Sequence, residues 1–239
     1  MGNNLVILPL ICLVGGAFAV YLTARLVTRQ NAVLASLTAL VLILSLILVG
    51  QLDSDTRLAV TNGGPMPAWG NFTPGAVFLQ ADPGAVLIAE VALGLGIFVA
   101  LFSGRYLALD KRYETYYPLL LLLMTGIIGM VLAVDLFNLY LFCELMSLCT
   151  YVLVAFRRRT DTAIEAGFKY LIMGSVGTIT MLFGISYVFR ATGSIILPIA
   201  NCMDTLAGRT GLAFLMVGFG IKSAVVPLHT WLPDAHGRA

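Results

Sequence analysis

Seven long apolar stretches divide this sequence, and they constrain its fold more than any other feature. They lie at about 4–24, 33–51, 84–103, 117–134, 136–156, 167–189 and 208–228. A helix needs about 20 apolar residues to cross the hydrocarbon core of a bilayer. Charged residues make up only 11% of the chain, whereas an average globular protein has about a quarter. The sequence therefore predicts an all-α polytopic membrane protein with about seven transmembrane helices, in contact with lipid.

Basic residues are distributed unevenly between the two sides of the predicted bundle. The loops after the first, third and fifth stretches hold Arg25, Arg29, Arg105, Lys111, Arg112, Arg157, Arg158 and Arg159. The opposite side holds Arg57, Arg190 and Arg209. Because Lys and Arg concentrate in cytoplasmic loops, we expect the N-terminus outside and the C-terminus inside. A net charge of +2 spread over short loops forms no basic patch, so no nucleic-acid partner is expected.

The predicted outside loop, at about 52–83, is rich in turn-forming residues. The Gly, Pro and Trp content of "TNGGPMPAWGNFTPGAVFLQADP", at 61–83, favours a turn-rich or hairpin-forming segment at the membrane interface. Asp82 followed by Pro83 is typical of a helix N-cap and a first-turn proline. Asp135, just before the stretch at 136–156, is also interpreted as an N-cap.

The cysteines and histidines form no redox or metal motif. Cys12, Cys143, Cys149 and Cys202 contain no C-x-x-C pair and lie mostly in apolar runs, so we interpret them as buried, inert thiols. Neither histidine has a metal-ligand spacing with a cysteine or a carboxylate. We therefore expect no metal and no cofactor in this chain.

Glu144 lies near the middle of "LYLFCELMSLCTYVLVAF", an otherwise apolar stretch at 139–156. A charge at the centre of a membrane helix costs about 2.5–3.5 kcal/mol on insertion scales. Tyr140, Ser147 and Tyr151 share a helix face with Glu144, and a polar face must meet protein or water. The sequence favours an ion-translocating glutamate. The alternative is a protonated Glu144 that only hydrogen-bonds a neighbouring helix.

Lys222 lies inside the last apolar stretch, in "LMVGFGIKSAVVPLHTWLPDAH", shortly before Pro227. Pro227 has no N–H and its ring clashes with the carbonyl of Ser223, so the helix should kink or break beside Lys222. Freed carbonyls at membrane depth are tolerated only against protein or water. The pattern is therefore typical of a hydrated site on a broken helix. "GFGIKS" lacks the spacing and the preceding strand of a phosphate-binding loop.

Lys169 and His229 are further candidates for ion translocation. Lys169 lies near the start of the sixth stretch with Glu165 one turn before it, so a surface ion pair is an equally open alternative. His229 falls two helical turns beyond Lys222 and could continue its polar face. His236 is expected in a loop.

Glu144 and Lys222, on separate predicted helices, suggest an electrostatically coupled pair. At about 7 Å and an effective dielectric constant of about 20, they would attract by about 2.4 kcal/mol. Separating them by a few ångströms would let the lysine release its proton. We therefore predict that Glu144 controls when Lys222 is charged.

Three segments in this order and spacing resemble the antiporter-like proton-translocating subunits of respiratory complex I, membrane-bound hydrogenases and Mrp-type cation/proton antiporters. They are "FNLYLFCELMSLCTYVLVAF", "AGFKYLIMGSVGT" and "KSAVVPLHTWLPDAH". The resemblance covers essentially the whole chain. It implies that Glu144 and Lys222 are the glutamate and the broken-helix lysine of a half-channel, with Lys169 and His229 beside them. It also implies that partner subunits, and not this chain, carry out the electron transfer.

The family fold contains two inverted repeats, of which the first would begin at the fourth stretch. Residues 1–115 would form three N-terminal transmembrane helices, and residues 116–239 the first repeat without its last helix. Because the sequence stops at "DAHGRA", we expect another chain to supply the remaining helices. The expected setting is a multisubunit complex in an energy-coupling membrane, such as a prokaryotic cytoplasmic membrane. Protons are favoured over sodium. The alternatives are a non-conducting scaffold module of such a complex and an unrelated solute transporter.

Overall fold

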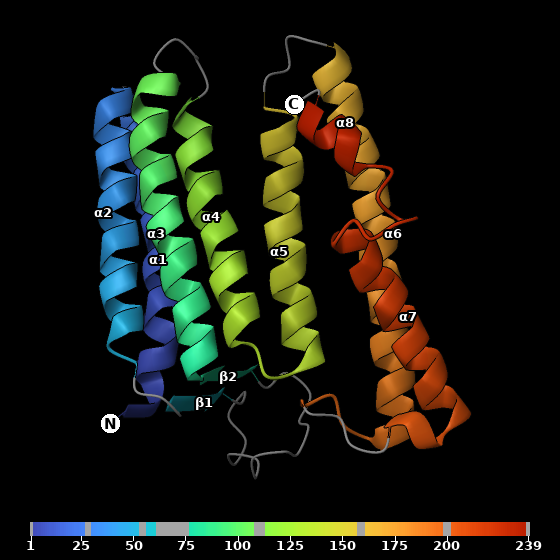
Figure 1. Ribbon diagram of the computed structural model, residues 1–239. Coiled ribbons are helices and arrows are strands. Elements are labelled where there is room, and N and C mark those ends of the chain that lie inside the picture. Colours follow the sequence, from blue (N-terminus) through green and yellow to red (C-terminus); the bar gives the residue numbers. More distant parts are fainter. Residues whose placement is uncertain are drawn as a thin grey trace. The chain divides into compact units, whose positions relative to one another are not determined.

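The structure is a computed structural model and describes residues 2–26, 30–52, 56–60, 77–107, 113–156, 161–197 and 202–237 (Figure 1). Helices account for most of these residues, which confirms the predicted all-α class. Within the described residues, six helices are long and apolar enough to cross a membrane. They are α1 (Leu8–Leu26), α2 (Asn31–Gly50), α3 (Pro83–Tyr106), α4 (Tyr113–Leu132), α5 (Leu136–Val154) and α6 (Asp161–Thr192).

The seventh predicted span corresponds to α7 (Leu206–Lys222), a helix of 17 residues. The sequence placed its end near 228, but the helix stops at Lys222. The shorter elements are η1 (Gly2–Ile7), β1 (Thr56–Val60), β2 (Val77–Ala81), η2 (Cys202–Asp204) and α8 (Leu232–Gly237). β1 pairs with β2. Most of the predicted turn-rich loop, residues 61–76, lies outside the described residues.

The helices form two compact units. Unit 1 comprises Met1–Ala59 and Val77–Ala133 and contains α1 to α4, whereas unit 2 comprises Val60–Ala76 and Val134–Ala239 and contains α5 to α8. By packing, α4 therefore belongs with the first three helices. The predicted division at 115/116 concerns a repeat and not a packing unit, and it stays a prediction.

In unit 1, hydrogen bonds join α2, α3 and α4 at one end of the helices. Asn31 donates from Nδ2 to the carbonyl of Gly104 at 2.9 Å and accepts from Tyr117 Oη at 2.5 Å. Tyr117 is fully buried. Nearby, Ser103 Oγ on α3 lies 2.9 Å from Tyr116 Oη on α4. Because polar groups in a membrane must be satisfied within the protein, this network stabilises the packing of the three helices.

Both predicted N-caps are confirmed. Asp82 accepts a hydrogen bond from the N–H of Ala85 at 2.6 Å, with Pro83 as the first residue of α3. Asp135 accepts from the N–H of Asn138 at 2.8 Å at the start of α5. Each carboxylate satisfies a donor that has no partner inside its helix. These two acids are therefore explained by helix capping.

In unit 2, α6 and α7 pack antiparallel along a seam of glycines (Figure 1). A Cβ added to Gly184 would lie 2.9 Å from the carbonyl of Gly211, and one added to Gly218 would lie 2.8 Å from the carbonyl of Gly177. On each helix the two glycines are two turns apart, so they lie on one face. Small residues at such positions let helix backbones approach closely, as is typical of membrane proteins.

Most of the basic residues behind the predicted orientation lie in loops outside the described residues. They are Arg29, Lys111, Arg112, Arg157, Arg158 and Arg159. The placement of the N-terminus outside and the C-terminus inside therefore stays a prediction.

Candidate functional site

The site begins where α7 ends. Ser223 follows the helix as its C-cap, and Ala224 adopts a left-handed conformation with φ of 53°. The N–H of Ala224 donates to the carbonyl of Ile221 at 3.2 Å, and the N–H of Val225 donates to Gly220 at 2.9 Å. These two bonds form a Schellman motif, which satisfies carbonyls that a helix end leaves free. The predicted helix break beside Lys222 is confirmed.

Pro227 lies in the non-helical segment 223–231 that follows the break. The same segment supplies a second donor to the end of α7, because Trp231 Nε1 donates to the carbonyl of Ile221 at 2.9 Å. Trp231 is buried. The end of the helix is thus satisfied by protein groups, as a helix end at membrane depth requires.

The break lies opposite the middle of α6. A Cβ added to Gly177, near the centre of that 32-residue helix, would lie 3.1 Å from the side chain of Ile221. Lys222 is the next residue, so its backbone is level with the middle of an apolar helix. This places the lysine far from both ends of α6.

The Lys222 ammonium is hydrogen-bonded to two hydroxyls on α5. Nζ donates to Ser147 Oγ at 2.5 Å and to Tyr151 Oη at 3.2 Å. It also lies 5.7 Å from the centroid of the Tyr151 ring. Ser147 and Tyr151 are both buried. The sequence placed these two residues on the polar face of Glu144, and the structure brings Lys222 from α7 to that face.

A glycine on α6 makes room for Tyr151. A Cβ added to Gly174 would overlap with Tyr151 Oη, well inside the contact distance of unbonded atoms. Tyr151 also packs edge-on against Tyr170 of α6, with ring centroids 4.7 Å apart. Tyr170 in turn stacks on Trp231 at 4.4 Å with an interplanar angle of 9°. Three aromatic rings therefore connect α5, α6 and the segment after the break.

Glu144 lies one turn before Ser147 on α5 and is half-buried. Its Oε2 atom is buried and has no hydrogen-bond partner among the described residues. In the same part of the chain, Lys222 donates to Ser147 and Tyr151 and not to Glu144. The electrostatic coupling of Glu144 and Lys222 stays a prediction.

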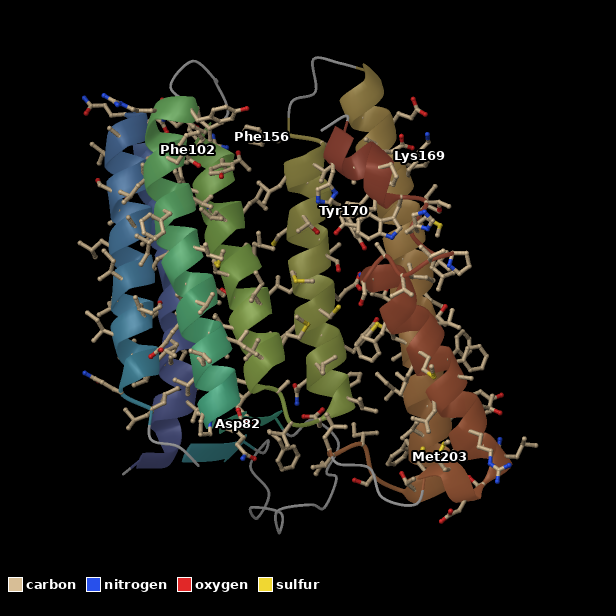
Figure 2. All side chains as sticks on the ribbon, in the orientation of Figure 1. Asp82, Phe102, Phe156, Lys169, Tyr170 and Met203 are labelled. Atoms are coloured by element: carbon tan, nitrogen blue, oxygen red, sulfur yellow. The ribbon has the colours of Figure 1, made fainter. Side chains whose placement is uncertain are left out.

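Lys169, labelled in Figure 2, lies on the part of α6 that faces α8. Its Nζ is 2.7 Å from Glu165 Oε1 on α6 and 2.9 Å from Asp234 Oδ2 on α8. The Lys169 side chain is 44% exposed. The sequence-based alternative, an ion pair with Glu165, is therefore present, and Asp234 adds a long-range partner. The predicted role of Lys169 in translocation is a separate prediction that this geometry does not decide.

His229 is half-buried in the segment after α7, and its Nδ1 atom has no hydrogen-bond partner among the described residues. The expectation that His229 continues the helix face of Lys222 is wrong, because the helix ends at Lys222 and the periodicity stops there. His236 was expected in a loop, but it lies in the short helix α8. Its Nδ1 atom is 3.2 Å from the carbonyl of Leu232 in the same helix.

The described cysteines are free thiols, and three of the four are buried. Burial raises the pKa of the Cys202 thiol, which lies in η2 outside the long helices. This supports the interpretation of Cys202 as unreactive, because the thiolate is the reactive form. Among the described residues no group of three His, Cys, Asp or Glu side chains is arranged to hold a metal ion. The absence of a metal or a cofactor stays a prediction.

Residues 133–239 match a family described as NADH:quinone oxidoreductase/Mrp antiporter, transmembrane. A subunit (type N) of NADH-quinone oxidoreductase from Desulforudis audaxviator is 36% identical over 71% of this chain and 34% of its own length. A Na⁺/H⁺ antiporter protein from Bacillus subtilis, also a subunit, is 28% identical over 98% of this chain and 47% of its own length. The chain thus spans half or less of the length of these relatives.

A solved structure of the membrane-bound sulfane sulfur reductase, an archaeal respiratory membrane complex, has a similar fold. One of its chains superposes with a TM-score of 0.78 and 26% sequence identity, over 100% of this chain and 48% of that chain. The predicted resemblance and the multi-pass membrane character of the chain are confirmed by these similarities.

Proposed function

Because the chain belongs, over residues 133–239, to the NADH:quinone oxidoreductase/Mrp antiporter transmembrane family, we propose that it is an ion-translocating membrane subunit. Its relatives are subunits of NADH-quinone oxidoreductases and of Na⁺/H⁺ antiporters. We further propose that it works in a multisubunit complex, either a redox-driven pump or a cation/proton antiporter.

The observation that carries the proposal is the position of Lys222. It lies at a helix end opposite the middle of α6, among the hydroxyls of Ser147 and Tyr151, with Glu144 one turn away on the same face of α5. Ionisable groups inside a membrane protein are costly and mark ion pathways by default. A lysine and a glutamate that are both shielded from lipid form a suitable pair for moving a charge.

Protons are the ions that this chemistry favours. An amine and a carboxyl group each bind and release a proton, whereas an ammonium repels a sodium ion. At a separation of about 7 Å and an effective dielectric constant of about 20, the attraction of Glu144 and Lys222 would be about 2.4 kcal/mol. That energy would favour the charged lysine while the pair is close, and it would fall as the pair separates.

Lys169 and His229 are proposed to take part on either side of Lys222. Lys169 is half-exposed and bound to two carboxylates, so it is suited to exchange protons with water. His229 follows the break and has a buried ring nitrogen without a partner among the described residues. An imidazole titrates near neutral pH, which suits a residue that passes protons onward.

We propose that partner subunits supply the electron transfer, and that further helices complete the conducting unit. The relatives are about twice as long as this chain or longer, which supports the second statement. Orientation with the N-terminus outside is proposed from the basic loops. Labelling of single cysteines placed at 29 and 111 with an impermeant maleimide would test it, since both should react only from the inside.

The proposed function is tested by replacing the two charges in the native complex, reconstituted in proteoliposomes. Lys222→Met and Glu144→Gln keep the approximate volume and remove the charge, so each should suppress proton translocation without loss of assembly. Glu90→Gln, which removes a half-buried carboxyl from α3 in unit 1, is the matched control. Normal translocation by both site variants would favour the alternative, a non-conducting scaffold module.

A further inference from the structure

The hydroxyls of Ser147 and Tyr151 have a geometry that translocation by Glu144 and Lys222 does not require. We propose that they are positioning residues, which hold the Lys222 ammonium at a resting place on α5 that is distinct from its place beside Glu144. This inference rests on the proposed function, because it assumes that Lys222 carries the translocated charge.

The hydrogen bonds define the resting place. A lysine ammonium has three N–H donors, and two of them are used by Ser147 Oγ at 2.5 Å and Tyr151 Oη at 3.2 Å. The Ser147 hydroxyl donates its own proton to the carbonyl of Cys143 at 2.7 Å. Its lone pairs are therefore the part that meets Lys222. The third N–H of the ammonium remains for water or for another acceptor.

Both acceptors are neutral, and this decides what they can do. A serine or tyrosine hydroxyl is too weak a base to take a proton from an ammonium, so the resting place stabilises a charged lysine without discharging it. A carboxylate differs, because it adds a full opposite charge. Exchange of the lysine proton would therefore occur away from these hydroxyls.

The second place lies one turn along the same helix face. Glu144 precedes Ser147 by three residues, which is an axial distance of about 4.5 Å in an α-helix. Its Oε2 atom is buried and has no hydrogen-bond partner within the described part of the chain. A flexible lysine stem can move its ammonium over such a distance without movement of the backbone. The ammonium thus has two alternative sets of acceptors on α5.

The resting place is built by α6 as well as α5. Tyr151 Oη occupies space that only a glycine at 174 leaves open, and the ring rests edge-on against Tyr170. The position of the hydroxyl is therefore fixed by a neighbouring helix. A fixed acceptor can hold an ammonium at a defined place, whereas a mobile hydroxyl would follow it toward Glu144.

The test uses the native complex in proteoliposomes, with proton flux as the readout. Ser147→Ala and Tyr151→Phe each remove one acceptor, and each should reduce turnover about tenfold, because hydrogen bonds to charged groups are among the stronger ones. Ser147→Thr restores a hydroxyl at the same position and should recover turnover to within about twofold. Ser45→Ala, which removes a buried hydroxyl in unit 1, and Tyr170→Phe, which removes a hydroxyl that contacts Thr150, are the matched controls.

An infrared measurement gives a readout that does not depend on turnover. The carboxyl band of Glu144 is assigned by its loss in Glu144→Gln. In Ser147→Ala and Tyr151→Phe this band should shift, because the ammonium moves to the carboxylate. An unchanged band together with control-level flux would overturn the inference, and so would a loss of flux that Ser147→Thr does not rescue. If Lys222→Met itself pumps normally, the proposed function fails first, and the two failures are thereby distinguished.

Discussion

Lys169 Nζ on α6 lies 2.9 Å from Asp234 Oδ2 on α8, so an ion pair joins the segment after the helix break to the long helix beside it. The stack of Tyr170 on Trp231 joins the same two parts of the chain. Adjacent residues of α6 thus hold the segment that carries His229. Lys169 could act as a proton carrier or as this attachment, and the two roles respond differently to charge exchange.

The first prediction concerns the exchange of the two charges. Lys169→Asp and Asp234→Lys should each lower proton flux, by about fivefold or less, because exposed ion pairs are weak. The double variant restores an opposite-charge pair and should recover flux if the pair only attaches α8. Flux in proteoliposomes is the measurement. A double variant as impaired as the worse single variant would instead support proton transfer through Lys169.

Glu165→Gln provides the control for this experiment. Glu165 contacts Lys169 at 2.7 Å within one helix, so its replacement removes the local pair and leaves the contact to α8. Its effect on flux should be smaller than that of Asp234→Asn, which removes the contact between α6 and α8.

The second prediction concerns Gly174. In Gly174→Ala the new methyl group would collide with Tyr151 Oη, so Tyr151 must leave its position beside Lys222. Overpacking of this kind costs about 1–3 kcal/mol of stability. Thermal unfolding in detergent should show a lower midpoint, and flux should fall. Gly94→Ala is the matched control, since nothing lies within 4 Å of its added Cβ. Equal midpoints for both variants would contradict the close approach of α5 and α6.

The third prediction concerns Ala224, whose φ of 53° is unfavourable for any residue with a Cβ. Ala224→Gly removes that strain at the end of α7 and should raise stability by about 0.5–1 kcal/mol. Ala213→Gly, at an exposed position within α7, should lower stability instead by about 1 kcal/mol. Chemical unfolding in mixed micelles compares the two. A loss of stability in Ala224→Gly would show that this turn does not persist.

The fourth prediction concerns the capping role of Asp135. Asp135→Ala leaves the N–H of Asn138 without its acceptor and should lower stability by about 1 kcal/mol. Asp135→Ser keeps an acceptor of a different length and should lose less than half of that. Because Asp135 is explained by the cap, proton flux per assembled complex should stay unchanged in Asp135→Ser. Loss of flux in this variant would assign Asp135 to the ion pathway.

The long helices and the helix break were predictable because each follows from local physics. Twenty apolar residues favour a spanning helix whatever its neighbours are, and Asp82 and Asp135 cap helices that begin a few atoms away. The end of α7 near Lys222 followed from the proline beyond it. The structure fixes the end at Ala224, where the chain turns before the proline is reached.

The contacts of Lys222 were not predictable from the sequence, because they depend on how α5, α6 and α7 are aligned. Ser147 and Tyr151 were placed on the correct helix face, but nothing local indicated that they accept from Lys222. Gly174 gave the one usable signal, since a glycine inside an apolar helix often marks a close approach. Asp234 was missed because six residues are too few for a recognisable helical pattern.

The glycine seam between α6 and α7 limits which motions could accompany a change of charge at Lys222. Backbone atoms of the two helices meet at Gly177 with Gly218 and at Gly184 with Gly211, so no side chain lies between them to change rotamer and absorb a displacement. A sliding motion of α7 would drive main-chain atoms into one another at both levels. The two helices therefore behave mechanically as one beam, and any rearrangement at the lysine must come from its own stem, from α5, or from the segment beyond the break.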